Sequence, residues 1–137
     1  MTWHKIDDVE GIGPAHARKL RKAGVKSVNG FLKKARRRSG RRELAGETQL
    51  SESLILKWAN MADLYRIKGI GSEYAELLEK AGVDTVKELR KRKPEPLQKK
   101  LAEVNSRGRA RVRRMPGLKR VKSWIGKAKK LKPWLSY

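Results

Sequence analysis

Apolar residues recur every three or four positions along most of this chain, which is the spacing that places them on one face of a helix. Ala17 and Leu20 carry such a stripe near the start, and Ala75 and Leu78 carry one near the middle. Segments that alternate apolar and polar residues are short, and β-branched residues are sparse, so strands are not expected. The pattern predicts an all-α fold.

Capping residues mark several of the expected helix boundaries. Pro14 fits the first turn of a helix, where its missing N–H costs nothing, and Gly24 fits the left-handed position that follows a helix. Ser27, Ser51 and Thr85 each precede a helical stripe, and their side chains can accept hydrogen bonds from the first amides of a helix. Helices are therefore expected to begin just after these three residues.

Three stretches lack a clear helical stripe. Residues 36–42, which surround Ser39-Gly40, are predicted to form an exposed basic connection before a short helical piece at 43–46. Pro94 and Pro96 are predicted to break the chain ahead of another short helix. Residues 105–117 are predicted to form a basic loop.

One short pattern occurs twice along the chain. The first bend is Gly11-Ile12-Gly13, and the second bend is Gly69-Ile70-Gly71. An ungapped alignment of residues 11–31 with residues 69–89 has ten identical positions among 21. A glycine-apolar-glycine bend that opens a helix leaves backbone N–H groups pointing outward at the positive end of that helix. Such a bend is suited to bind a phosphate.

The recurrence extends beyond the two bends. Trp58 is matched by Trp124 later in the chain, and both lie on inward helical stripes, where we expect them to be core residues. The two tryptophans near the termini are expected to pack against the fold, with stacking on single-stranded bases as the alternative. We infer two similar helical units, at 1–62 and 63–137.

Charge adds the first indication of a partner. The net charge is +22 at pH 7 over 137 residues. Residues 1–42 carry +10 and residues 90–132 carry +16, on either side of a mildly acidic middle. Compact folding works against this self-repulsion, so a polyanion is the natural partner of such a chain. We expect nucleic acid, and a surface that serves solubility alone is the alternative.

Other function classes have little support. The chain has no cysteine and two histidines without metal-binding spacing, and the acids Asp7, Asp8 and Glu10 suit helix caps better than a Mg²⁺ site, so no metal or other cofactor is expected. No nucleophile–base arrangement or phosphate-loop lysine signature is present, so we expect no enzyme activity and no small-molecule substrate. No apolar run approaches a membrane span or resembles a signal peptide, which predicts a cytoplasmic protein without a membrane partner, nucleoid-associated if it binds DNA.

The first bend is the stronger candidate for contact with a phosphate. Its amides at Ile12, at Gly13 and just after Pro14 are expected to face the anion, and glycine lets a sugar-phosphate approach closely. Cations follow on the next helix. The expected contacts are Gly11, Ile12, Gly13, His16, Arg18, Lys19 and Lys22.

The second bend is followed by acids. Glu73 and Glu76 stand where the first copy has Ala15 and Arg18, and a carboxylate in the first turn repels phosphate. A tight helix connection without a ligand is therefore the strong alternative at this bend. The expected contacts here are Lys68, Gly69 and Gly71. Further expected contacts, with a solvated basic loop as the alternative, are Arg37, Arg38, Arg41, Arg107, Arg109, Arg111, Arg113 and Arg114.

Two family resemblances follow from these residues. Both 6–20 and 64–78 match the order apolar-x-x-apolar-x-Gly-apolar-Gly-x-x-x-Ala-x-x-Leu, which resembles the helix-hairpin-helix motif. That resemblance implies sequence-independent binding to a nucleic-acid backbone through hairpin amides and nearby Lys or Arg. Other characteristic stretches are Val9–Pro14, Ala59–Leu64, Arg66–Gly71, Ala81–Leu89 and Arg113–Pro116. Through them the chain is similar to the domain-of-unknown-function 4332 family, which implies no particular activity.

The leading hypothesis is non-catalytic, sequence-independent binding of nucleic acid. DNA is preferred over RNA because hairpin modules usually meet duplex DNA, which is an argument by analogy. One alternative is an RNA- or ribosome-associated protein, since arginine-rich loops also suit structured RNA. Another is a helical protein–protein interaction module whose partner contacts the acidic second bend. Neutralisation of about four to six phosphates predicts a slope of log K against log salt of roughly −4 to −5 for duplex DNA.

Overall fold

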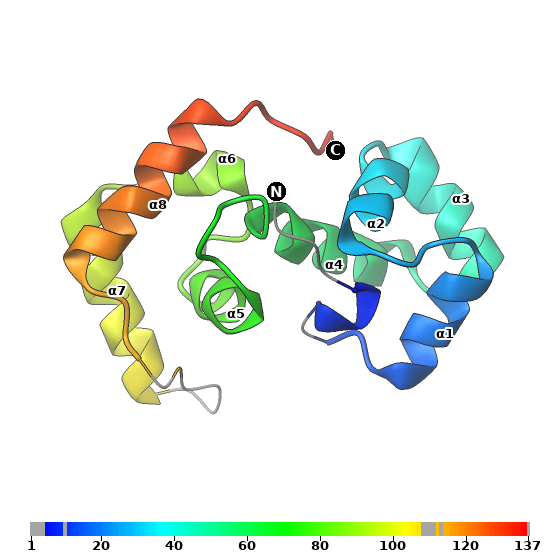
Figure 1. Ribbon diagram of the computed structural model, residues 1–137, viewed down its shortest axis with the longest axis horizontal. Coiled ribbons are helices and arrows are strands. Elements are labelled where there is room, and N and C mark those ends of the chain that lie inside the picture. Colours follow the sequence, from blue (N-terminus) through cyan, green and yellow to red (C-terminus); the bar gives the residue numbers. More distant parts are fainter. Residues whose placement is uncertain (1–4, 10, 108–111, 113, 137) are drawn as a thin grey trace. The chain divides into compact units, whose positions relative to one another are not determined.

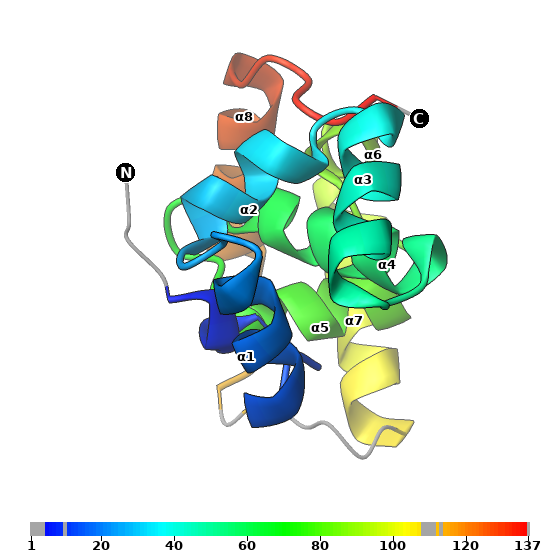
Figure 2. The same ribbon diagram turned by 90° about the vertical axis from the view of Figure 1, so that its right-hand side faces the viewer.

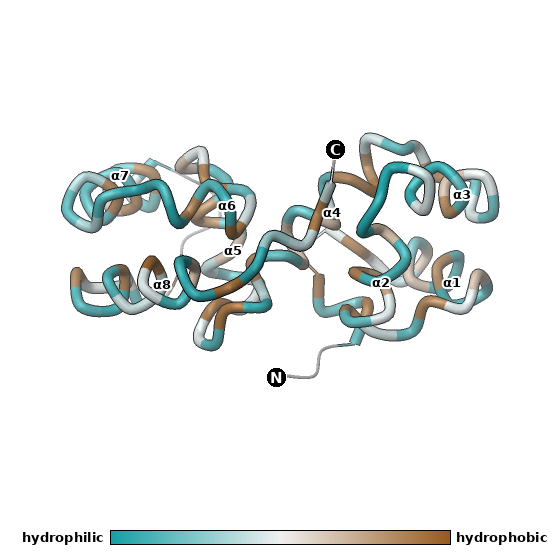
Figure 3. The backbone as a smooth tube through the Cα atoms, turned by 90° about the horizontal axis from the view of Figure 1, so that it is seen from above, coloured by the Kyte–Doolittle hydropathy of each residue, from teal (hydrophilic) through white to brown (hydrophobic). Residues whose placement is uncertain are grey.

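The computed structural model describes residues 5–9, 11–107, 112 and 114–136. Within these residues the regular elements are helices and no strand is formed, which confirms the predicted all-α fold (Figure 1). The elements are η1 (Ile6–Asp8), α1 (Pro14–Lys22), α2 (Val28–Ala35), α3 (Arg38–Thr48), α4 (Glu52–Leu64), α5 (Ser72–Lys80), α6 (Val86–Leu89), α7 (Pro94–Arg107) and α8 (Leu118–Lys130). Figure 3 shows apolar positions spaced along these helices between hydrophilic ones.

The backbone contacts divide the chain into two compact units. Unit 1 comprises Met1–Asp63 with Trp134–Tyr137, and unit 2 comprises Leu64–Pro133. The sequence placed the boundary one residue earlier, between 62 and 63, and assigned the last four residues to the second unit. Within unit 1, Trp134 donates from Nε1 to the Leu32 carbonyl over 2.8 Å.

Unit 1 packs η1 and α1 to α4 around an apolar core. Fully buried side chains of this core include Leu20, Phe31 and Trp58. Helix α1 ends as expected at Gly24, whose φ is +89°, and the Val25 amide reaches back to the Leu20 carbonyl over 2.9 Å. That pattern is the glycine-ended C-cap in which a left-handed residue satisfies the last carbonyls of a helix.

Unit 2 packs α5 to α8 around a core of the same character, with α7 beside α8. Leu78 and Trp124 are among its fully buried residues. Gly82 ends α5 with a φ of +90°, and the Val83 amide donates to the Leu78 carbonyl over 2.8 Å. The Thr85 hydroxyl caps α6 by accepting from the Glu88 amide over 3.1 Å, as the sequence predicts.

Elements follow in the same order in the two units. Helices α1 and α5 begin at Pro14 and Ser72, directly after the two bends, and each has nine residues. Helices α4 and α8 begin at Glu52 and Leu118, and each has thirteen. Trp58 and Trp124 occupy the same position within these two longer helices. Each tryptophan-bearing helix therefore belongs to the unit of the matching bend.

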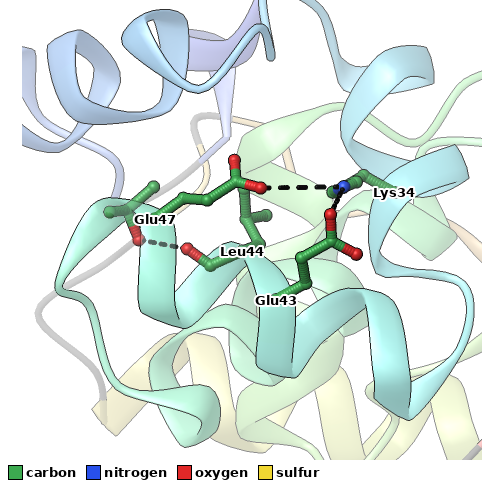
Figure 4. A network of polar contacts seen from close by, with 5 residues as sticks. Lys34, Glu43, Leu44 and Glu47 are labelled. Atoms are coloured by element: carbon green, nitrogen blue, oxygen red, sulfur yellow. Dashed lines mark hydrogen bonds and ion pairs between the residues drawn. The ribbon is translucent and has the colours of Figure 1, made fainter.

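The exposed connection predicted at 36–42 is wrong. Residues 38–48 form α3, which packs beside α2 (Figure 2). Lys34 on α2 forms ion pairs with two acids of α3, at 2.8 Å to Glu43 and 4.0 Å to Glu47 (Figure 4). The hydrogen bond from Lys34 lowers the pKa of Glu43, and the same bond raises the pKa of Lys34. Tertiary contacts thus fix a helix whose first turn carries glycine and serine.

The break predicted at Pro94 and Pro96 is also wrong. Pro94 is the first residue of α7, and Pro96 lies in the same turn, where a missing amide leaves no helical hydrogen bond unmade. Helix α7 then runs through Arg107, so residues 105–107 are helical rather than part of a loop.

Candidate functional site

The second bend is held in a conformation that requires glycine at its first position. Gly69 has a φ of +99°, and a Cβ added there would lie 3.5 Å from Nε1 of Trp124. Ile70 is buried, and its amide donates to the Ile67 carbonyl over 3.1 Å. The apolar residue therefore anchors the bend in the core, while Lys68 and Gly69 remain exposed.

Gly71 completes the bend as the N-cap of α5. Its φ of −100° is ordinary, and open space surrounds the position of an added Cβ. No side chain caps this helix end, and the first backbone bond of α5 runs from the Ala75 amide to the Gly71 carbonyl over 2.9 Å. The preceding amides of α5 lack intrahelical acceptors, as at any helix start, and the helix dipole favours an anion beside them.

The second bend opens onto a pocket of about 570 Å³ within unit 2, which we call the basic pocket. Its walls come from the bend, from the segment before α8 and from the first three turns of α8. The lining residues are Lys68, Gly69, Arg114, Met115, Gly117, Lys119, Arg120, Ser123, Trp124 and Lys127. Five of them are cations and none is an acid.

Tyr74 on α5 organises one side of the basic pocket. Its hydroxyl donates to the Arg114 carbonyl over 2.9 Å and accepts from Nη1 of Arg120 over 2.8 Å. The Arg120 guanidinium also lies 5.6 Å from the centre of the Tyr74 ring, which in turn packs at 5.1 Å against Trp124. On the other side, Nζ of Lys127 donates to the Lys68 carbonyl over 3.1 Å. These contacts hold cations from separate segments beside the bend.

Three acids of unit 2 form ion pairs with cations outside the basic pocket. These ion pairs are Glu76 with Lys80 at 3.4 Å, Glu88 with Arg92 at 3.2 Å and Glu103 with Arg107 at 2.9 Å. Among the residues that the structure describes, none of the five pocket cations forms an ion pair with a carboxylate. The pocket therefore gathers five cations that, within the described part of the chain, have no carboxylate at ion-pair distance.

The first bend has the same backbone. Gly11 has a φ of +91°, and a Cβ there would lie 3.4 Å from Nε1 of Trp58. The ring of His16 packs against that indole with a centroid distance of 5.1 Å, in the position that Tyr74 takes in unit 2. Gly13 is exposed and forms the N-cap of α1, and Pro14 supplies no amide.

One expected contact at the first bend is corrected by the structure. From the sequence, the Ile12 amide was predicted to face a phosphate. Ile12 is buried, and its amide donates to the Val9 carbonyl over 3.0 Å. The reason is the same as at Ile70, since the apolar residue between the two glycines must reach the core. The exposed cations of α1, among them Arg18, Lys19 and Lys22, remain candidates.

The two units also differ in the helix that carries the tryptophan. Three cations of α8 that line the basic pocket are replaced by neutral residues at the matching positions of α4, counted from the start of each helix. These pairs are Lys119 with Ser53, Arg120 with Leu54 and Lys127 with Met61. From the sequence we ranked the first bend above the second, but the tryptophan-bearing helix supplies three pocket cations at the second bend that its counterpart at the first bend lacks.

The arginines predicted as contacts around the start of α3 differ in their exposure to solvent. Arg37 and Arg38 are exposed, as a contact with nucleic acid requires. Arg41 is buried, so its assignment as a binding residue is corrected. Its guanidinium donates to the carbonyls of Ala35 and Ser136, each over 2.7 Å, and so is engaged in holding α2 and the C-terminal segment of unit 1.

The structure describes only part of the basic loop predicted at residues 105–117. Arg107 is exposed at the end of α7 and pairs with Glu103. Arg114 lines the basic pocket. Arg109, Arg111 and Arg113 lie outside the described residues.

Sequence reasoning missed Lys119, Arg120 and Lys127 as site residues. A signal for them was present, because the matched tryptophans place α8 against the second bend in the way that α4 lies against the first. Reading outward from Trp124 along that helix finds the three cations on the side of the bend.

The comparisons place this architecture in a family. The model of a domain of unknown function, DUF4332, matches residues 10–131. The chain belongs to the DUF4332 family. The match spans both bends and the basic pocket, which therefore lie in the part that this member shares with the DUF4332 model. No curated protein and no solved structure matches the chain.

Two searches of the described residues bear on other kinds of site. No group of three or more His, Cys, Asp or Glu side chains is arranged to hold a metal ion in that part of the chain. Among the same residues, no helix has the length and apolar character needed to cross a membrane.

Proposed function

We propose that this DUF4332 protein binds nucleic acid, double-stranded DNA in particular, without catalysis and without reading its sequence. The two bends act as helix-hairpin-helix elements whose outward amides receive phosphates. Lys and Arg side chains around them add charge-assisted contacts. Contacts to phosphates position a protein on nucleic acid but carry no sequence information, which fits the absence of a base-reading motif in the chain.

The observation that carries the proposal is the basic pocket beside the second bend. Gly69 of the bend lines this pocket together with five side-chain cations that have no carboxylate partner among the described residues. A tight helix connection without a ligand needs only the glycines, whereas uncompensated cations around the bend cost folding energy through self-repulsion. A polyanion removes that cost.

The test is fluorescence anisotropy with labelled duplex DNA, single-stranded DNA and duplex RNA over a salt series. Five phosphates neutralised at the pocket predict a slope of log K against log salt of about −4.5 on duplex DNA. If duplex RNA binds most tightly, RNA rather than DNA is the ligand. Binding that does not change with salt would refute both the DNA and the RNA reading.

A matched pair of variants locates the contact. Lys119→Ala/Lys127→Ala removes two cations of the basic pocket, and Lys99→Ala/Lys100→Ala removes two exposed cations of α7 that do not line it. Both variants have the same net charge. The pocket variant is expected to reduce the magnitude of the slope by about 1.8, and the α7 variant to change it little. Equal losses from the two variants would show that net charge, rather than the pocket, attracts the DNA.

A further inference from the structure

The cations of the basic pocket come from three separate segments of unit 2. Lys68 belongs to the second bend, Arg114 to the segment before α8, and Lys119 and Lys127 lie two turns apart on α8. An extended nucleic-acid strand carries one phosphate per about 3.4 Å of axis, so its phosphates reach the bend along a line. Cations that converge on one pocket from three segments suit a compact anion better than a linear one.

The size and charge of the pocket set limits on that anion. A volume of about 570 Å³ lies in the range of small-molecule sites in proteins. Five cations without carboxylate partners call for two or three phosphate groups, because a phosphate monoester carries roughly −1.5 to −2 charges at pH 7. A single phosphate or sulfate leaves most of this charge unbalanced.

The one aromatic side chain among the described residues that line the pocket is buried. This side chain is Trp124, of which 1% is exposed and whose ring packs at 5.1 Å against Tyr74. The Tyr74 ring is itself covered by the Arg120 guanidinium on one side. Recognition in the pocket therefore depends on hydrogen bonds and charge directed at phosphoryl oxygens.

We propose that the basic pocket of unit 2 is a binding site for a compact polyphosphate, with two or three linked phosphoryl groups. The phosphate tail of a nucleoside triphosphate and free tripolyphosphate share this chemistry, and the burial of Trp124 predicts similar affinity for both. The site does not depend on nucleic-acid binding. Because the second bend forms its rim, an occupying polyphosphate also competes with DNA for the same cations.

Isothermal titration calorimetry at fixed ionic strength tests the site. Orthophosphate, pyrophosphate, tripolyphosphate and a nucleoside triphosphate are titrated into the full chain without DNA. Affinity is expected to rise from orthophosphate to tripolyphosphate, with one tripolyphosphate bound per chain with high affinity. The nucleoside triphosphate is expected to bind within a few-fold of tripolyphosphate. Affinities that are equal for orthophosphate and tripolyphosphate would overturn the proposal.

The matched variants separate the pocket from net charge. Lys119→Ala/Lys127→Ala is expected to weaken tripolyphosphate binding by about tenfold or more, since each lost charge-assisted hydrogen bond is worth that order. Lys99→Ala/Lys100→Ala, with the same net charge, is expected to stay within about twofold. Equal losses, or several equivalent tripolyphosphates per chain, would show diffuse attraction and refute the site. Circular dichroism confirms that both variants are folded.

A duplex anisotropy measurement on the same samples distinguishes this proposal from the proposed function. If duplex DNA binds and depends on Lys119 and Lys127 while tripolyphosphate does not bind, the polyphosphate site is refuted and the DNA proposal stands. If tripolyphosphate binds in the pocket while no nucleic acid binds, the DNA proposal is refuted and the polyphosphate site stands. If both bind, saturating tripolyphosphate is expected to displace duplex DNA more effectively than sulfate does at equal ionic strength.

Discussion

Replacing Gly71 by alanine separates the folding role of the second bend from its binding role. The φ of Gly71 is −100°, which alanine adopts freely, and no atom lies within 4 Å of the added Cβ. Alanine is a poorer N-cap than glycine by several tenths of a kcal/mol, and it gains about 0.4–1 kcal/mol by restricting the unfolded chain. These terms oppose each other, so the free energy of unfolding should change by less than about 1 kcal/mol.

The binding effect of Gly71→Ala is expected to be larger. If phosphates approach the amides of the second bend, the new methyl group lies where they must pass. Loss of one charge-assisted hydrogen bond costs about 1.5–3 kcal/mol, which weakens duplex binding by about tenfold to a hundredfold. Gly69→Ala provides the contrast, because its φ of +99° makes alanine strained by about 1–3 kcal/mol and the fold itself should lose stability.

Thermal unfolding and duplex anisotropy on the same protein samples distinguish an effect on folding from an effect on DNA binding. For a unit of this size, 1 kcal/mol corresponds to a melting-temperature shift of about 4–8 °C. Gly71→Ala should melt within about that shift of the parent while binding DNA more weakly. Gly13→Ala, which also meets open space, makes the same change at the first bend and should weaken binding less. A Gly71→Ala protein that binds DNA as tightly as the parent would refute backbone contact at the second bend.

Three further predictions concern unit 1. Arg41→Ala should lower the free energy of unfolding by about 1–3 kcal/mol, because the Ala35 and Ser136 carbonyls lose a donor; an unchanged urea midpoint would contradict this. Gly40→Ala should also destabilise, since an added Cβ clashes with the Lys34 carbonyl oxygen; a melting temperature equal to that of the parent would argue against this close approach of α2 and α3. The lowered pKa of Glu43 predicts a contribution to stability that is complete above the ordinary glutamate pKa of 4.5 and is lost as the pH falls through the lowered value. Melting curves over an acid pH series should show this dependence in the parent and less of it in Glu43→Gln.

Local sequence signals were sufficient where a helix has a stripe and a cap of its own. Ser27 accepts from the Gly30 amide over 3.0 Å and Ser51 accepts from the Leu54 amide over 3.1 Å, so both predicted N-caps are confirmed. Helix α3 could not be found in this way, because its first turn contains Ser39 and Gly40, which are weak helix formers. Its position depends on the buried residues Leu44 and Arg41, with a smaller contribution from the exposed ion pairs of Lys34, and these contacts exist only once α2 and α3 are packed together.

The candidate site also has one part that the sequence predicts and one part that depends on tertiary packing. The glycines of both bends follow from the sequence pattern, because an apolar residue between two glycines must turn inward. Among the cations of the basic pocket, Lys68 and Arg114 were expected from the sequence, whereas Lys119 and Lys127 were not, since they are far from the second bend along the chain. Their place depends on the packing of Trp124 beneath Gly69, which is a tertiary contact.

The central claim is that a polyanion is held at the second bend by its backbone and by the basic pocket. Amide chemical shifts of ¹⁵N-labelled protein titrated with duplex DNA test this claim most directly. The account predicts the largest shift changes at Gly69, Gly71 and the first turns of α8, and smaller ones at Lys99 and Lys100. Changes confined to other surfaces, with Gly69 and Gly71 unmoved at saturation, would contradict it.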